Sequence, residues 1–431
     1  MRKYIFYASI FVLLLLLLGL ALGHAYLAPG DDPADDGLAA PDQALLGYFE
    51  PDYERSRAEF RRLATGLQEE HRGVERGAIA VPGQRALAAD GPATLDARGD
   101  LTIDWVYVPA QAQPRRLLIV TSGLHGAEGP VGSAVQRYFM DAVLPRTDLD
   151  ELSVLLVHAL NPFGFRHMRR VTENNVDLNR NFDTAPDLFA LKNPGYRAIN
   201  DMLNPEAPVD LGSLQSRLFA ERAVLLIARH GMSTLRQAIL QGQYEIARGV
   251  YFGGHAFEPH KAGLEALLTR IIPAHGAVMM VDLHTGYGQR GTLHLYPNPP
   301  ATEAIERDTE AVFAGYHIDW PHRDEDFYST TGGLIDWVGK LLDRETQRYV
   351  PMVFEFGTLD SHTTPGAIDS LQRTVFENQG FHHGHASPAD EAEVRRRFSE
   401  MFYPSSPRWR TQVMATARDL WPVILGRFAA L

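Results

Sequence analysis

The sequence LLIVTSGLHGAEGP, residues 117–130, indicates both how the chain folds and where its chemistry lies. Its first six residues form a short apolar run, which is typical of a strand buried on both faces of a sheet. A glycine-rich turn follows and leads into a predicted helix over residues 131–143. In open α/β sheets, ligand sites lie just beyond the carboxyl ends of such strands. His125 and Glu128 fall at that position, so we expect them to belong to a site.

His125 and Glu128 are a partial set of zinc ligands. They are close together in a tight turn, which can direct both side chains at one point. A second histidine would complete the His₂Glu set of hydrolytic zinc enzymes. The alternative is a glycine-rich turn whose histidine and glutamate only pair with each other.

Strands and helices alternate along the rest of the chain. Apolar runs and alternating patterns predict further strands at residues 103–108, 154–158, 278–283, 292–296 and 350–356. Helices are predicted at residues 51–70, 214–229, 264–272, 302–314 and 335–342. This order predicts one α/β domain with a mixed, mainly parallel sheet flanked by helices. Residues of about 184–275 carry no catalytic pattern and are interpreted as a helical insertion in that domain.

The composition excludes several classes of protein. The chain has 431 residues, 45% of them hydrophobic and 22% charged, which is ordinary for a globular protein. Its net charge of −12 argues against nucleic acid as a partner. It contains no cysteine, which excludes disulfides, thiol catalysis and cysteine-ligated metals. Any metal must therefore be held by histidine, aspartate or glutamate.

The N-terminal residues predict a membrane segment. Arg2 and Lys3 precede an uncharged stretch, residues 4–23, that is long enough to cross a bilayer as a helix. We interpret residues 1–25 as a signal anchor, residues 26–45 as an acidic flexible tether, and residues 46–431 as the catalytic domain. The basic residues should stay in the cytoplasm, which places the domain outside it, in the periplasm if the source is bacterial. The alternative is a cleaved signal peptide and a secreted protein.

Three further segments carry candidate functional residues. Residues 161–182 concentrate arginines and asparagines, which fits either an anion-binding loop or solvated ion pairs. His284 follows the apolar run of residues 278–283. Glu355 lies in an otherwise apolar strand, where a carboxylate is either a satisfied structural acid or a general base with a raised pKa.

Taken in order, these motifs resemble the zinc carboxypeptidase family. The resemblance rests on His125-x-x-Glu128, on NPFG at 161–164 with DLNRN at 177–181, and on His284 with Tyr296-Pro297. It is completed by Tyr328 with GGLIDW at 332–337, and by Glu355 in its strand. The opening FEPDYERSRAEF at 49–60 resembles an uncharacterised bacterial branch of the same superfamily.

The resemblance implies a role for each matching residue. His125, Glu128 and His284 would bind one Zn²⁺ per chain, and Glu355 would act as the general base. Arg169 matches the arginine that stabilises the oxyanion, with Arg170 as the alternative because the loop is shorter here. Asn179 and Arg180 match the pair that binds the terminal carboxylate of the substrate. Tyr328 matches the tyrosine that closes over the substrate, and Ile335 the position that sets side-chain preference.

The sequence therefore predicts a zinc-dependent metallopeptidase that hydrolyses C-terminal peptide bonds. Its expected substrate is a peptide or an acylated amino acid with a free carboxylate. One alternative is a zinc deacylase of the aspartoacylase type, which resembles this site in its metal ligands, arginine and Asn-Arg pair. Another is a catalytically silent zinc-containing binding module. Retention of Glu355 beside all three ligands favours the enzyme.

Overall fold

The fold centres on one mixed sheet of seven strands. The structure, a computed structural model, describes the chain except residues 1–31, 82–100, 298–301, 321–322 and 324–329. The strands are β1 (Glu75–Ala80), β2 (Thr102–Val108), β3 (Arg116–Ser122), β4 (Leu152–His158), β5 (Ala277–Gly286), β6 (Leu293–Tyr296) and β7 (Arg348–Gly357).

The strand order explains where a site can form. The order across the sheet is β1-β2-β4-β3-β5-β7-β6. The four central strands β4, β3, β5 and β7 are parallel, whereas β1, β2 and β6 pair antiparallel at the two edges. The predicted mixed sheet is confirmed, and all of its predicted strands are present. The carboxyl ends of β3, β5 and β7 lie side by side, because neighbouring parallel strands end at the same edge of the sheet.

β1 was not predicted. Its sequence ERGAIA contains no apolar run, and its outer side chains are exposed because it is an edge strand. Gly77 is required there, because a Cβ atom at this position would lie 2.5 Å from the Trp105 ring on β2. Its pairing with β2 therefore depends on a contact that local sequence patterns do not reveal.

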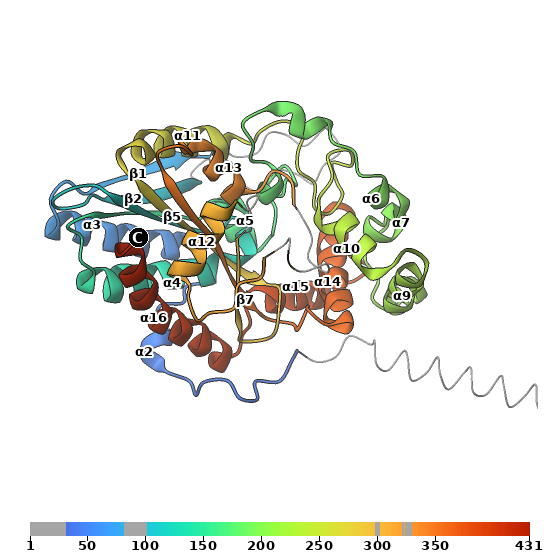
Figure 1. The fold of residues 1–431 in the computed structure, drawn as a ribbon. Helices are drawn as coiled ribbons and strands as arrows, with labels where there is room; N and C mark the ends of the chain where they lie inside the picture. Colours follow the sequence, from blue (N-terminus) through green and yellow to red (C-terminus); the bar gives the residue numbers. More distant parts are fainter. Residues whose placement is uncertain (1–31, 82–100, 298–301, 321–322, 324–329) are drawn as a thin grey trace, which may run out of the picture.

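Helices cover both faces of the sheet. Leu118 and Val120 of β3 face one core, and Leu117 and Ile119 face the other, as the two-residue period of a strand requires. The first core is covered by α3 (Tyr53–Glu70), α4 (Gly129–Tyr138), α12 (Glu303–Val312) and α16 (Pro407–Ala429). The second is covered by α11 (Pro259–Ile271) and α13 (Leu334–Leu341), which lie on the opposite side of the sheet in Figure 1. The remaining helices before and after the insertion are α2 (Gln43–Leu46), α5 (Pro162–His167), α14 (Thr364–His383) and α15 (Pro388–Phe402).

The segment at 184–275 is helical and builds a core of its own. Its helices are α6 (Pro194–Ala198), α7 (Asn200–Leu203), α8 (Leu214–Arg217), α9 (Phe219–His230), α10 (Met232–Leu240) and α11. α6, α7, α9 and α10 pack with α14 and α15 rather than on the sheet, whereas α11 returns to the sheet. In Figure 1 the green helices α6, α7, α9 and α10 stand at one end of the molecule, beside α14. We refer to α6–α10 as the insertion helices.

The N-terminal predictions fall largely outside the described residues. No helix in the described part of the chain is long and apolar enough to span a bilayer. The predicted span at 4–23 lies outside that part and stays a prediction. From residue 32 onward the predicted tether contacts the domain: Asp32 forms an ion pair with Arg373 at 3.0 Å, and Asp35 one with Arg290 at 2.8 Å.

Candidate metal centre and active site

Two adjacent strand ends bring the predicted metal ligands together. His125 follows β3 and begins a short 3₁₀ turn, Gly126–Glu128, that positions Glu128. His284 lies in β5, the parallel neighbour of β3. Gly126 allows the turn to pack closely, because a Cβ atom there would lie 2.0 Å from the backbone of Gly164 in α5.

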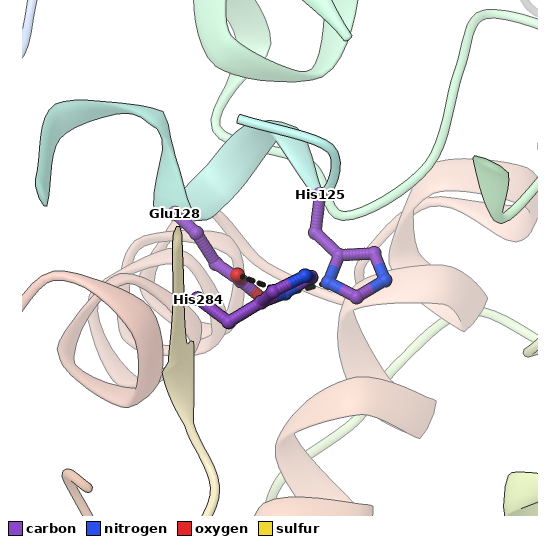
Figure 2. Close-up of side chains that lie close together, drawn as sticks. All are labelled: His125, Glu128 and His284. Atoms are coloured by element: carbon purple, nitrogen blue, oxygen red, sulfur yellow. Dashed lines mark hydrogen bonds and ion pairs between the residues drawn. The ribbon is translucent and has the colours of Figure 1, made fainter. Parts of the chain in front are cut away.

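The side chains of these three residues converge on one buried point. Glu128 lies between the two rings: its Oε1 is 2.8 Å from His125 Nδ1, and its Oε2 is 2.9 Å from His284 Nδ1. One ligand atom from each residue lies within 4.8 Å of the others, and all three residues are buried (Figure 2). This donor set of two imidazoles and one carboxylate fits the protein ligands of a catalytic zinc site. Other divalent metals also bind such donors.

The outer ring atoms of both histidines face carboxylates. His125 Nε2 lies 3.2 Å from Asp177 Oδ1, and His284 Nε2 lies 2.7 Å from Asp282 Oδ2. Asp282 is itself held by the Thr121 hydroxyl, which donates to its Oδ1 at 2.5 Å. Metal-binding histidines usually have such partners, which fix the ring and its tautomer. This arrangement supports the interpretation of both Nδ1 atoms as ligand atoms.

Neither aspartate was predicted from the sequence to have a role. Asp282 precedes His284 by two residues, so both side chains lie on the same face of β5. That spacing was a usable signal. Asp177 was included in the DLNRN motif, but its contact with His125 depends on how distant loops pack.

Charges within the cluster shift the pKa of Glu128. Burial by itself would raise this pKa, but His125 and His284 outweigh burial and lower it to about 2. The carboxylate is therefore ionised at neutral pH, as a metal ligand must be.

Glu355, the predicted general base, lies beside this cluster. It is on β7, directly opposite His284 in the register of β5 and β7. Its Oε1 accepts a hydrogen bond from the backbone N–H of Tyr287 at 2.9 Å. Burial raises the pKa of Glu355 to about 8, and the nearby Glu128 carboxylate adds to that rise. A divalent cation held by the three ligands would lower this pKa again, since positive charge favours the ionised carboxyl.

The two adjacent arginines have different positions. Arg170 lines the same cavity as His125, Glu128 and Glu355, and its Nη1 lies 3.8 Å from Glu128 Oε1. Its Nε donates to Asp177 Oδ2 at 3.0 Å. Arg169 points toward α14, where it forms an ion pair with Glu377 at 2.7 Å and packs on the Phe381 ring. The structure therefore brings Arg170 into the site and not Arg169.

The predicted carboxylate-binding pair also lines this cavity. Asn179 and Arg180 both line it. The Arg180 guanidinium donates to the backbone carbonyls of Asn179 and Leu240. Hydrogen bonds to neutral carbonyls hold its position without cancelling its charge, so it still attracts an anion.

Two other predicted residues are not part of the observed site. Ile335 is not among the residues that line the described cavity; it is buried in the core between α13 and the sheet, and its role in side-chain preference stays a prediction. The first turn of α13 directs this side chain inward, as the apolar face of a helix on a sheet requires. Tyr328 lies outside the described residues, and its role stays a prediction.

The family model described as "Protein of unknown function (DUF2817)" matches residues 49–416. The chain belongs to the DUF2817 family. Among curated proteins, none matches this DUF2817 chain.

Solved structures similar to this DUF2817 protein include carboxypeptidases. Bovine thrombin-activatable fibrinolysis inhibitor, in complex with tick carboxypeptidase inhibitor, is 15% identical over 77% of this chain and 95% of its own, with a TM-score of 0.40. Carboxypeptidase A from Helicoverpa armigera is 13% identical over 89% and 80%, with a TM-score of 0.39. An aspartoacylase family protein from Mesorhizobium loti is 17% identical over 72% and 66%, with a TM-score of 0.31.

Proposed function

We propose that this DUF2817 protein is a zinc-dependent hydrolase of the metallocarboxypeptidase type, which cleaves the C-terminal amide bond of its substrate. One observation carries the proposal: His125, Glu128 and His284 converge within 4.8 Å, and Glu355 lies opposite His284 on the next strand. A silent binding module would not require a carboxylate with a raised pKa at that position.

The proposed metal would be held by His125, Glu128 and His284. When bound, zinc lowers the pKa of a water molecule and polarises a substrate carbonyl. Asp177 and Asp282 would hold the two imidazoles in the orientation that metal binding needs.

The remaining residues would provide the acid–base and electrostatic steps. Glu355 would accept a proton from the attacking water at a carboxylate oxygen and pass it to the nitrogen of the leaving amine. Arg170 would stabilise the negative charge that develops on the substrate carbonyl oxygen. Asn179 and Arg180 would bind the terminal carboxylate and so align the last amide bond with Glu355.

A free carboxylate on the substrate is expected to be required. A blocked dipeptide with a free C-terminus should be cleaved about 10- to 100-fold more efficiently than its C-terminal amide, because the amide loses charge-assisted hydrogen bonds to Arg180. The experiment compares kcat/KM for the two compounds with zinc-loaded protein, using mass spectrometry to identify products. Equal cleavage of acid and amide would contradict this role of Arg180.

The same assay distinguishes the peptidase from a deacylase. N-Acetylated amino acids are included beside the blocked dipeptides, each with and without a chelator. Chelator-sensitive cleavage of the dipeptides supports the proposal. Hydrolysis confined to N-acetyl amino acids would establish the aspartoacylase-type alternative, and no hydrolysis of either set would contradict both.

Arg170 is expected to matter for turnover and Arg169 for stability. Arg170→Gln should lower kcat/KM by about 10²–10³-fold, as removal of an oxyanion donor does. Arg169→Gln is the matched control, one residue away. It should mainly lower the melting temperature, because it breaks a buried ion pair with Glu377. Zinc content is measured in both variants, since Arg170 also contacts Asp177. The assignment is contradicted if Arg169→Gln causes the larger loss of kcat/KM.

A further inference from the structure

The cavity that contains the candidate active site continues into an apolar compartment. At one end it is lined by Glu128, Arg170 and Glu355. Toward the insertion helices its walls become aliphatic, with Leu226 and Ile227 from α9 and Leu235 and Ile239 from α10. α14 contributes the facing wall, with Ile368 and Leu371. Most of the charged groups are thus gathered at one end and the aliphatic groups at the other, where Arg236 of α10 also lines the cavity.

Arg180 lies where the two parts meet. Its guanidinium donates to the carbonyl of Leu240, the last residue of α10. Gly242 allows this contact: it has a φ of +90°, and a Cβ atom there would lie 2.8 Å from Arg180 Cδ. The apolar wall therefore begins directly beside the residue proposed to bind the substrate carboxylate.

This arrangement identifies the part of the substrate that would occupy the compartment. A carboxylate bound at Arg180 places the group on the adjacent carbon next to the aliphatic wall of α10. The whole cavity, its charged end included, measures about 200 Å³, whereas apolar cavities of about 150 Å³ already bind benzene. The apolar end is only part of that volume, so it limits the bound group to at most one ring or a short alkyl chain. Burying such a group against aliphatic side chains is favourable, and burying a charged side chain there is not.

We infer that the insertion helices and α14 build the specificity pocket, and that the substrate carries a large apolar side chain on its carboxylate-bearing residue. This inference rests on the proposed function and extends it to a substrate class. Residues such as Leu226 and Leu235, rather than Ile335, would then determine which side chain the substrate carries. These residues come from a segment without any catalytic motif.

A binding experiment tests the pocket without relying on turnover. Full-length, zinc-loaded protein is titrated calorimetrically with straight-chain carboxylates from acetate to octanoate. Affinity should rise by about fourfold for each added methylene until the compartment is filled. An affinity that does not change along the series would overturn the inference.

Two variants of α9, with a third as control, test where the apolar group of the ligand binds. Ala223 of α9 lines the compartment, so Ala223→Met should reduce its depth and move the best-bound carboxylate to a shorter chain. Leu226→Ala should weaken hexanoate binding several-fold. Leu225→Ala is the matched control, because the neighbouring Leu225 is 69% exposed and does not line the cavity. Equal effects of Leu225→Ala and Leu226→Ala, in variants that melt like the wild type, would also overturn the inference.

Measurements of hydrolysis distinguish a failure of this inference from a failure of the proposed function. Blocked dipeptides ending in alanine, norleucine and phenylalanine are compared, and the two with large apolar side chains should have at least tenfold higher kcat/KM than the alanine compound. If all three are cleaved equally in a zinc-dependent manner, the pocket inference fails and the proposed function stands. If none is cleaved but the carboxylate series shows the expected trend, the proposed function fails and the apolar pocket stands.

Discussion

Glu355→Gln is expected to bind zinc as the wild type does and to lose about 10²–10⁴-fold in kcat, the usual contribution of a general base. The amide has nearly the same shape as the carboxyl and still accepts the hydrogen bond from the Tyr287 N–H. It cannot take a proton from water at neutral pH. Metal content by elemental analysis and kcat on a blocked dipeptide check both parts. Near wild-type kcat would remove Glu355 from its proposed role.

The same substitution should stabilise the metal-free protein in a pH-dependent way. Burial raises the pKa of Glu355 from 4.5 to about 8 in the folded protein. Between these pH values the folded protein holds a proton that the unfolded chain has released, so the free energy of unfolding falls as the pH rises. Glutamine does not titrate. Metal-free Glu355→Gln should therefore melt higher than the metal-free wild type, with a difference that grows from pH 4.5 toward pH 8. A difference in melting temperature that does not change with pH would contradict the raised pKa.

His284→Ala is expected to abolish both zinc binding and hydrolysis. It removes one of three protein ligands and leaves Glu128 and His125 as an incomplete set, which lowers metal affinity sharply. It also leaves Asp282 buried without its imidazole partner. Elemental analysis after dialysis should find less than a tenth of the wild-type zinc, and activity should fall to background.

A second histidine of the same region provides the control. His275 lies just before β5, is buried, and contacts the Ser153 hydroxyl at 2.9 Å, but it is not part of the cluster. His275→Ala should lower the melting temperature and keep the zinc content. Full zinc binding and activity in His284→Ala would refute the proposed metal centre.

The choice between Arg169 and Arg170 shows where sequence reasoning reached its limit. Both residues lie in the same arginine-rich segment, and either could match the family motif. The backbone at Met168 has a φ of +50°, which turns the chain just before them. Arg169 consequently contacts Glu377 and Phe381 of α14, two residues that lie more than 200 positions later in the chain. No local pattern contains that information.

The lining of the apolar compartment is a second feature that could not be predicted from local sequence patterns. Ile335 occupies the position that the motif predicts, but the helix face that carries it is needed to cover the sheet. The cavity wall comes instead from the insertion helices, whose sequences carry no catalytic pattern. Which face of such a helix lines a cavity depends on the neighbour against which its other face packs.

The sequence by itself determined the central strands of the sheet and the candidate metal ligands. Buried parallel strands are written in the chain as apolar runs, and the candidate ligands lie at their carboxyl ends, so both are local features of the chain. Only the tertiary structure decided which arginine enters the site, which aspartates hold the two imidazoles, and which helices surround the apolar end of the cavity. These depend on contacts between residues far apart in the chain, which form only when the whole domain packs together.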